Sequence, residues 1–170
     1  QLVGAGDGHE NARRFRREAR ILAGLDHPHV VTVFDYREDG DLRLIVMEHL
    51  GGGTLSERLR ELDPPARLAA TIAAATGLHH AHMSGVLHRD VKPENLMFDR
   101  RQVLKVTDFG VARADVAALG SATVTDVELS RIGQLLGTPD YLSPEQAAAA
   151  MSGTAAELAP AADLYGLAAV

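Results

Sequence analysis

The chain has 170 residues, of which 46% are hydrophobic and 24% charged, with no cysteine and a formal net charge of −6. These values fit one domain with a buried core. They exclude a disulfide framework and give no electrostatic footprint for nucleic acid, and no apolar run approaches the ~20 residues of a membrane span.

The first third of the chain predicts a helix followed by a β-hairpin. The helix spans residues 11–25, with apolar residues on one face and arginines on the other, and an Asp-His-Pro sequence ends it. Strands rich in β-branched and aromatic residues are predicted over 30–36 and 42–47, with a turn at 37–40 between them. The apolar face of the helix consists of Phe15, Ala19, Leu22 and Leu25.

The middle of the chain predicts a joint and two helices. Three consecutive glycines at 51–53 indicate a flexible joint between two halves. A short helix begins at Thr54, whose spacing from Glu57 is that of a capping box. Asp63 stands as an N-cap before a proline, and an alanine-rich helix follows over 64–84.

Past residue 84 the predicted elements are short. Strands over 86–87 and 96–98 flank a loop that carries several charged and amide side chains. The remaining predicted elements are a strand at 104–106, a mobile loop at 111–142, a helix at 146–150 and a connection at 152–160.

The loop at 88–95, His-Arg-Asp-Val-Lys-Pro-Glu-Asn, carries the chemistry of the chain. A single aspartate in a loop is usually a turn former, but here Asp90 has Lys92 and Asn95 beside it. Asp90 can orient an attacking hydroxyl group, and Lys92 can neutralise a moving phosphoryl group. Asn95 and Asp108, which opens an Asp-Phe-Gly sequence, are hard oxygen ligands for Mg²⁺. The set is what phosphoryl transfer from a nucleotide needs.

These motifs, in this order and at this spacing, resemble the catalytic loop and the metal-binding motif of protein kinases. The sequence Gly-Thr-Pro-Asp-Tyr-Leu-Ser-Pro-Glu-Gln at 137–146 is most similar to that of the bacterial eukaryotic-like (Hanks-type) serine/threonine kinases. The resemblance implies an α+β class and a two-lobed protein-kinase fold, truncated at both ends. Residues 1–50 would form part of the small-lobe sheet, helix C and the hinge. Residues 51–170 would form the first half of the mainly helical large lobe, with the catalytic loop and the activation segment.

The resemblance also implies a reaction and roles for the loop residues. The reaction is transfer of the γ-phosphate of ATP to serine and threonine hydroxyl groups of proteins, with Mg²⁺. Asp90 would accept the proton of the hydroxyl group, and Lys92 together with Thr138 favours serine or threonine over tyrosine as the substrate. Asn95 and Asp108 would bind the metal.

The same resemblance implies a nucleotide site. Backbone groups of Glu48 and Leu50 would hold adenine, with Met47 as the gatekeeper side chain and Met97 beneath the ring. Glu18 would pair with a strand lysine, which the pattern predicts immediately before residue 1. Core packing is the alternative role for the two methionines, and a surface charge is the alternative for Glu18.

Further residues match structural features of the family. Glu145 would close the activation segment, and Asp163 would anchor a stack of apolar contacts between the lobes. That stack would consist of Leu22, Val33, His88 and Phe109. A phosphate on Ser130 would order the activation segment by pairing with Arg89, and the alternative is that Ser130 is a solvated loop hydroxyl group. The other candidate hydroxyl groups for phosphorylation are Ser121, Thr123 and Thr125, and a further partner of the phosphate is Arg113.

Other interpretations remain open beside the kinase. A catalytically silent kinase-like binding module is the main alternative, and a small-molecule phosphotransferase is a weaker one. A metal site at His79, His80 and His82 has no evident fourth ligand. The expected partners are ATP, protein substrates and a homodimer that phosphorylates itself in trans. The expected location is cytoplasmic, with any membrane anchor outside this segment. The chain has no Gly-rich phosphate loop, so we expect an inactive fragment.

Overall fold

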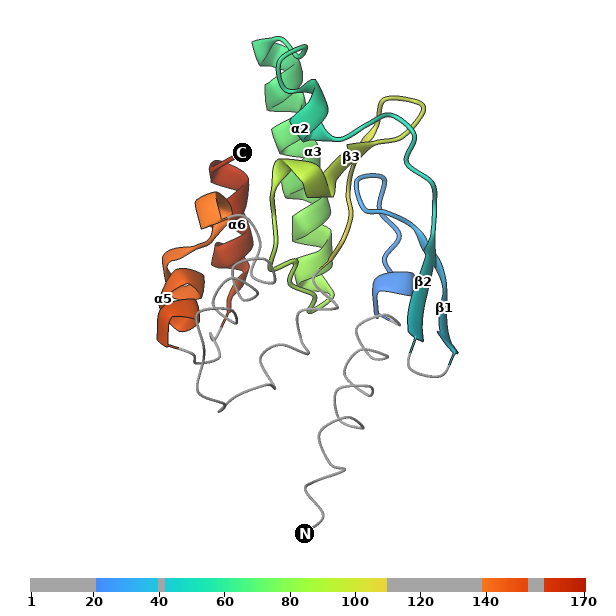
Figure 1. Cartoon of the computed structure of the whole chain (residues 1–170). Helices are drawn as coiled ribbons and strands as arrows, with labels where there is room; N and C mark the ends of the chain where they lie inside the picture. Colours follow the sequence, from blue (N-terminus) through green and yellow to red (C-terminus); the bar gives the residue numbers. More distant parts are fainter. Residues whose placement is uncertain (1–20, 40–41, 110–138, 153–157) are drawn as a thin grey trace.

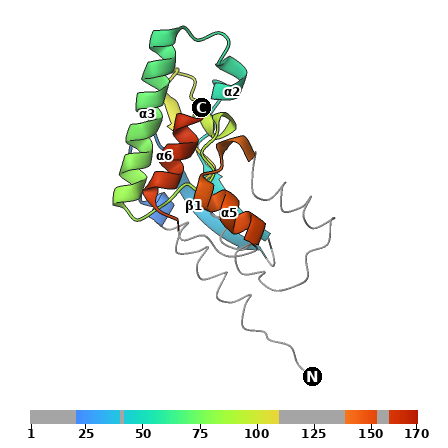
Figure 2. The same cartoon turned by 90° about the vertical axis from the view of Figure 1, so that its left-hand side faces the viewer.

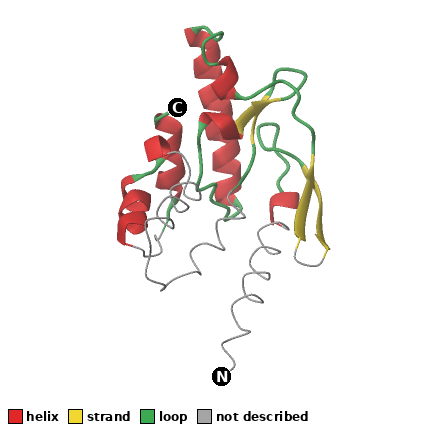
Figure 3. Ribbon diagram, in the orientation of Figure 1, coloured by secondary structure: helices red, strands yellow, loops and turns green. Residues whose placement is uncertain are grey.

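Two small β-sheets and a set of helices make up the computed structural model, which describes residues 21–39, 42–109, 139–152 and 158–170 (Figure 1). The strands lie on one side of the long helix α3 and the C-terminal helices on the other (Figure 3). The strands are β1 (Val33–Asp39), β2 (Leu42–Met47), β3 (Leu96–Phe98) and β4 (Leu104–Val106). The α-helices are α2 (Leu55–Arg58), α3 (Pro64–Met83), α5 (Pro144–Ser152) and α6 (Pro160–Ala168). Two 3₁₀ helices are η1 (Pro93–Asn95) and η3 (Pro139–Tyr141).

The first sheet is the antiparallel hairpin of β1 and β2. The prediction for β2 is confirmed. The prediction for β1 is wrong by three residues at each end, since the strand starts at Val33 and continues through the expected turn to Asp39. Its start is delayed because the backbone of residues 29–31 pairs with β4 instead, through a parallel bridge between Val30 and Val106.

The second sheet is the antiparallel hairpin of β3 and β4, both as predicted. Asp99 closes the turn between them, because its Oδ1 atom accepts hydrogen bonds from the backbone N–H groups of Arg101 and Val103, each at 2.8 Å. The expected strand at 86–87 is absent from the described structure. The N–H of Val86 caps α3 by bonding to the Ala81 carbonyl, so this backbone does not join a sheet.

The glycines at 51–53 are bonded to β3, which differs from the expected free joint. The N–H of Gly52 donates to the Phe98 carbonyl, and the N–H of Phe98 donates to the Gly53 carbonyl, both at 2.8 Å. A Cβ atom on Gly52 would lie 2.4 Å from the Asp99 carbonyl oxygen. Close approach of two backbone segments therefore requires glycine here.

Helices α2 and α3 begin as predicted. Thr54 and Glu57 form the capping box, with hydrogen bonds of 2.8 and 3.2 Å. The Asp63 carboxylate accepts from the N–H of Ala66 at 2.8 Å. Only the end of the helix predicted over 11–25 lies in the described part. It is helical to Ala23, two residues short of the predicted end, and a turn at Gly24 follows.

The core is centred on α3, which packs against β4 on one side and α6 on the other. Figure 2 shows α6 alongside α3, with α5 nearby. Gly77 allows α3 to pack closely against the backbone of His29. A Cβ atom at position 77 would lie only 2.4 Å from the His29 carbonyl oxygen. The fully buried apolar side chains include Ala74, Leu78, Ala81, Leu96 and Val106.

Helices α5 and α6 differ in extent from the predictions. Helix α5 exceeds the predicted 146–150 at both ends, because Pro144 suits a first helical turn and Ser143 caps it. Helix α6 begins at Pro160, the last residue of the predicted connection. Within the described ranges, none of the helices has the length and apolar character to cross a membrane.

Candidate active site

The loop between α3 and β3 brings Asp90, Lys92 and Asn95 together. The Lys92 Nζ atom lies 3.1 Å from Asp90 Oδ2. The Asn95 Nδ2 atom donates to the Asp90 backbone carbonyl at 2.8 Å and lies 3.2 Å from Asp90 Oδ2. Asn95 is buried, whereas Asp90 and Lys92 are partly exposed. The Asp90 carboxylate, which can accept a proton, and the cationic Lys92 side chain are thus held side by side and partly exposed.

Asp163 of α6 anchors the backbone of this loop. Its carboxylate is almost fully buried and accepts from the N–H of His88 at 2.8 Å and from the N–H of Arg89 at 2.7 Å. The same carboxylate lies 2.7 Å from His82 Nε2. Arg89 has a φ of 67°, a left-handed conformation that is unfavourable for a non-glycine residue. Asp163 was expected to anchor the apolar stack, and it is bonded to His88 of that stack. Its bond to Arg89 also holds the strained residue that precedes Asp90.

His88 joins the loop to the segment that follows β4. Its Nε2 atom lies 2.8 Å from the Thr107 carbonyl, and its Nδ1 atom accepts from the N–H of Asp90 at 3.2 Å. One ring nitrogen therefore donates and the other accepts, as in a neutral imidazole. Burial lowers the pKa of His88 from its ordinary 6.5, against opposing contributions from Asp163 and from the Thr107 hydrogen bond.

Thr107 places Asp108 beside the loop. The N–H of Thr107 donates to the Asn95 carbonyl at 2.9 Å, so both backbone groups of Thr107 are bonded to the loop at 88–95. Asp108 follows with a φ of 55°, and its side chain is exposed. Phe109 is buried, and its ring centroid lies 4.8 Å from that of His88.

The donor set of Asn95 and Asp108 fits Mg²⁺. The Asn95 Nδ2 atom is turned toward Asp90, which leaves the amide oxygen as the group to bind a metal. Mg²⁺ is typically bound by one or two protein oxygen ligands, with substrate phosphates completing its shell. Among the described residues no cluster of three or more histidine, cysteine or acidic side chains could hold a metal by itself.

The segment 47–50, termed the hinge segment, connects β2 to the glycines. The N–H of Glu48 donates to the Thr32 carbonyl at 2.9 Å. The Glu48 Oε1 atom accepts from the N–H of Thr32 at 2.7 Å and from Lys105 Nζ at 2.6 Å. Partial burial acts to raise the pKa of Glu48, but these hydrogen bonds outweigh it and the pKa is lowered.

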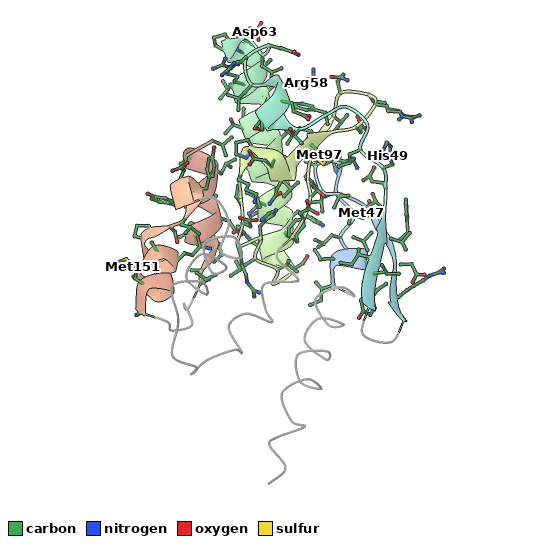
Figure 4. All side chains as sticks on the ribbon, in the orientation of Figure 1. Met47, His49, Arg58, Asp63, Met97 and Met151 are labelled. Atoms are coloured by element: carbon green, nitrogen blue, oxygen red, sulfur yellow. The ribbon has the colours of Figure 1, made fainter. Side chains whose placement is uncertain are left out.

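The predicted nucleotide-site residues lie around this segment. Leu50 is buried, and Met47 is 37% exposed at the end of β2. Met97 lies on β3 and is half-buried. Figure 4 labels Met47 and His49 on the β2 side and Met97 on the neighbouring hairpin. Leu22 and Val33, expected in the apolar stack with His88 and Phe109, are both buried.

Gln146 is a site residue that the sequence interpretation missed. Its Nε2 atom donates to the Arg89 carbonyl at 2.9 Å, and its Oε1 atom accepts from the N–H of Ser143 at 3.0 Å. The sequence Ser-Pro-Glu-Gln at 143–146 has the spacing of a capping box, which was the available signal. Lys105 was also missed, and only its charge in an apolar strand marked it. His82 was considered as a metal ligand, but its contact with Asp163 was not predicted.

The remaining predicted residues divide into three groups. Glu18, Thr138, Ser130 and Arg113 lie outside the described residues, as do Ser121, Thr123 and Thr125. Glu145 is exposed at the start of α5. The three histidines of α3 diverge, because His82 bonds to Asp163, His80 stacks on His27 at 5.1 Å between ring centroids, and His79 is exposed.

Comparison with known proteins gives one consistent result. The family model described as the protein kinase domain matches residues 4–170. The serine/threonine-protein kinase PrkC of Bacillus subtilis is 41% identical over 141 residues, which cover 81% of this chain and 20% of PrkC. PknB of Mycolicibacterium smegmatis is 43% identical over 141 residues, covering 79% of this chain and 21% of PknB.

The solved structures agree with the sequence relatives. The kinase domain of PknI from Mycobacterium tuberculosis matches with a TM-score of 0.67 and 30% identity, covering 94% of this chain and 54% of that one. The chain therefore spans about a fifth of the length of the curated relatives and about half of a solved kinase domain.

Proposed function

This chain belongs to the protein kinase domain family, and from that premise we propose that it carries the catalytic loop of a serine/threonine protein kinase. The parent protein, meaning the full-length product that contains this chain, would transfer the γ-phosphate of ATP to protein hydroxyl groups. The relatives PrkC and PknB are named serine/threonine-protein kinases, which supports the substrate class. We place the boundary between the two lobes near residue 50.

The observation that carries the proposal is the arrangement of Asp90, Lys92 and Asn95. Asp90 Oδ2 lies within 3.2 Å of both Lys92 Nζ and Asn95 Nδ2, so its carboxylate is oriented before any substrate binds. A substrate hydroxyl group would donate its proton to Asp90, and Lys92 would stabilise the charge that develops on the phosphoryl group. Phosphoryl transfer relies mainly on such positioning and electrostatic stabilisation.

Asn95 and Asp108 would hold Mg²⁺, and the ion would supply charge neutralisation for the phosphates. Glu48 and Leu50 would bind adenine through backbone groups, with Met47 and Met97 around the ring. Thr138 would support the serine/threonine preference together with Lys92, and Glu18 would pair with a lysine of the small lobe. Trans-phosphorylation within a homodimer and a cytoplasmic location are also proposals.

Phosphoamino-acid analysis tests the substrate class. The parent protein, given Mg-ATP and a generic protein substrate, is expected to yield phosphoserine or phosphothreonine. Asp90→Asn should abolish the signal, and Asp26→Asn, which changes an exposed aspartate outside the site, should retain it. A product that is mainly phosphotyrosine would contradict the proposal, and equal activity of wild type and Asp90→Asn would exclude the assigned role.

A further inference from the structure

The side chain of Glu48 accepts a hydrogen bond from the N–H of Thr32 that the Glu48 backbone carbonyl would otherwise accept. Thr32 and Glu48 face each other where the β1–β2 ladder ends, and the N–H of Glu48 donates to the Thr32 carbonyl. In an antiparallel pair of this kind, the two residues exchange both N–H···O bonds. Here the return bond from the N–H of Thr32 goes to Glu48 Oε1, at 2.7 Å.

The consequence falls on the Glu48 carbonyl oxygen. Among the described residues, no backbone N–H group donates to that oxygen. It therefore keeps its capacity to accept a hydrogen bond, whereas the N–H of the same residue is already bonded. A carbonyl oxygen of this kind selects a ligand that offers an N–H donor.

Lys105 fixes the Glu48 carboxylate in this position. Its Nζ atom lies 2.6 Å from Glu48 Oε1 and 3.5 Å from the Val30 carbonyl, and both charged side chains are largely buried, at 11% and 22% exposed. Lys105 belongs to β4, which is bonded to β3 and bridged to Val30. The carboxylate is thus attached to a part of the fold that does not belong to the β1–β2 hairpin.

We propose that Glu48 and Lys105 form a positioning pair that keeps the Glu48 carbonyl free to accept a hydrogen bond from the 6-amino group of adenine. The inference rests on the proposed function, because it concerns the nucleotide of that same site. It assigns the pair a role in base specificity. A purine with an amino group at position 6 can donate a hydrogen bond to the Glu48 carbonyl. A purine with a carbonyl group at position 6 cannot, because two acceptors would then face each other.

The test compares ATP with inosine triphosphate (ITP), which carries a carbonyl oxygen at position 6. KM and kcat for both nucleotides are measured in the parent protein and its variants. The wild type should prefer ATP. Lys105→Met releases the carboxylate, and Glu48→Ala lets the N–H of Thr32 pair with the backbone carbonyl. Each should raise the KM for ATP roughly five- to ten-fold, the value of about one hydrogen bond, and raise the KM for ITP less.

Conservative variants and a matched control separate positioning from general damage. Lys105→Arg keeps the cation and should retain most of the ATP preference. Glu48→Gln keeps an oxygen for the N–H of Thr32 and should lie between wild type and Glu48→Ala. Asp35→Asn is the control, because Asp35 also bonds a cation, Arg37, and a backbone N–H, that of Tyr36, on the same hairpin. It should leave both KM values unchanged.

The outcomes distinguish this inference from the proposed function. If the wild type transfers phosphate from neither nucleotide, the proposed function fails. If the wild type is active but Lys105→Met and Glu48→Ala leave the ATP-to-ITP preference unchanged, or raise both KM values equally, the positioning role is wrong. Should Lys105→Met fail to fold, the two Glu48 variants decide the same inference. A stronger ATP preference in Glu48→Gln than in Glu48→Ala supports the positioning role, and equal preferences overturn it.

Discussion

The loop at 88–95 and the β1–β2 hairpin are held in different ways. The loop is fixed by buried hydrogen bonds from side chains far apart in the sequence, with Asp163 bonded to the N–H groups of His88 and Arg89. The hairpin is held by its own ladder and exposes large apolar side chains such as Phe34, at 65%. The loop that carries the candidate catalytic residues is therefore tied to distant elements of the fold, whereas the hairpin depends mainly on its own ladder.

The largest expected effect is a loss of kcat after a substitution in the loop at 88–95. Asp90→Asn in the parent protein should lower kcat by about 10³-fold, because the proton acceptor is lost while the loop keeps its bonds. Nucleotide binding should stay nearly intact, since the proposed role of Asp90 concerns the hydroxyl group of the substrate. Asp108→Asn should instead weaken Mg²⁺-dependent nucleotide binding, measured by titration with and without the ion. Equal losses of binding in the two variants would contradict this division of roles.

The second effect concerns the anchor of the loop. Asp163→Ala leaves the N–H groups of His88 and Arg89 without their buried acceptor, and should lower the free energy of unfolding by about 3 kcal/mol. Urea denaturation of the parent protein measures it. Asp140→Ala, which removes an exposed carboxylate, should change stability by less than about 0.5 kcal/mol. If both variants lost the same stability, the loop would not depend on its anchor.

The third effect is a pH dependence in the same region. His88 has a lowered pKa in the folded protein and an ordinary value of 6.5 when unfolded, so the unfolded chain binds a proton first as pH falls. The contribution of neutral His88 to the free energy of unfolding should be fully present above pH 6.5 and decrease as the pH falls below it. Denaturation midpoints between pH 7.5 and 5.5 should show this slope, and His88→Gln should flatten it.

Two other histidines serve to interpret that slope. His27 also has a lowered pKa, through burial and then the neighbouring His80 and His29, so a residual slope should remain in His88→Gln. His49 is exposed in the hinge segment, and His49→Gln should leave the slope as in wild type. A slope that His88→Gln does not alter would mean that His88 is not the group responsible.

The smallest effect belongs to the hairpin. Phe34→Ser removes an apolar side chain that is already mostly in water, so stability should change by less than about 0.5 kcal/mol. Thermal unfolding of the parent protein checks it against Phe98→Ser, which opens the buried core at β3 and should be far more damaging. A large loss from Phe34→Ser would show that this face of the hairpin is covered in the parent protein.

Local signals in the sequence were sufficient for most of the described fold. The caps at Thr54 and Asp63 and the strands at 42–47, 96–98 and 104–106 follow from residue types within a few positions of each other. The errors arose where another segment took the backbone hydrogen bonds that a strand would need. Val86 bonds to Ala81 of α3, and residues 29–31 pair with the distant strand β4, which delays the start of β1.

The candidate site shows the same division between local and distant information. Asp90, Lys92, Asn95 and Asp108 lie in two short motifs, and the structure brings the first three within hydrogen-bonding distance. Gln146 and Lys105 act on residues 57 positions away, on Arg89 and Glu48 respectively, and no spacing in the sequence connects them. Such contacts depend on the assembled fold.

The short spacing between Lys105 in β4 and Asp108 just after the strand limits how the site can vary. Lys105 is bonded to Glu48 of the hinge segment, and Asp108 follows Lys105 by three residues. Under the proposed function, this short stretch of backbone would connect the segment that binds the base to a residue that binds the metal. Extended chain rises about 3.3 Å per residue, so the three steps from Lys105 to Asp108 span at most roughly 10 Å. The number of residues in this stretch then sets the distance between Lys105 and Asp108. An insertion or deletion of one residue between Lys105 and Asp108 would offset one end of the nucleotide from its binding groups, even if every side chain were kept.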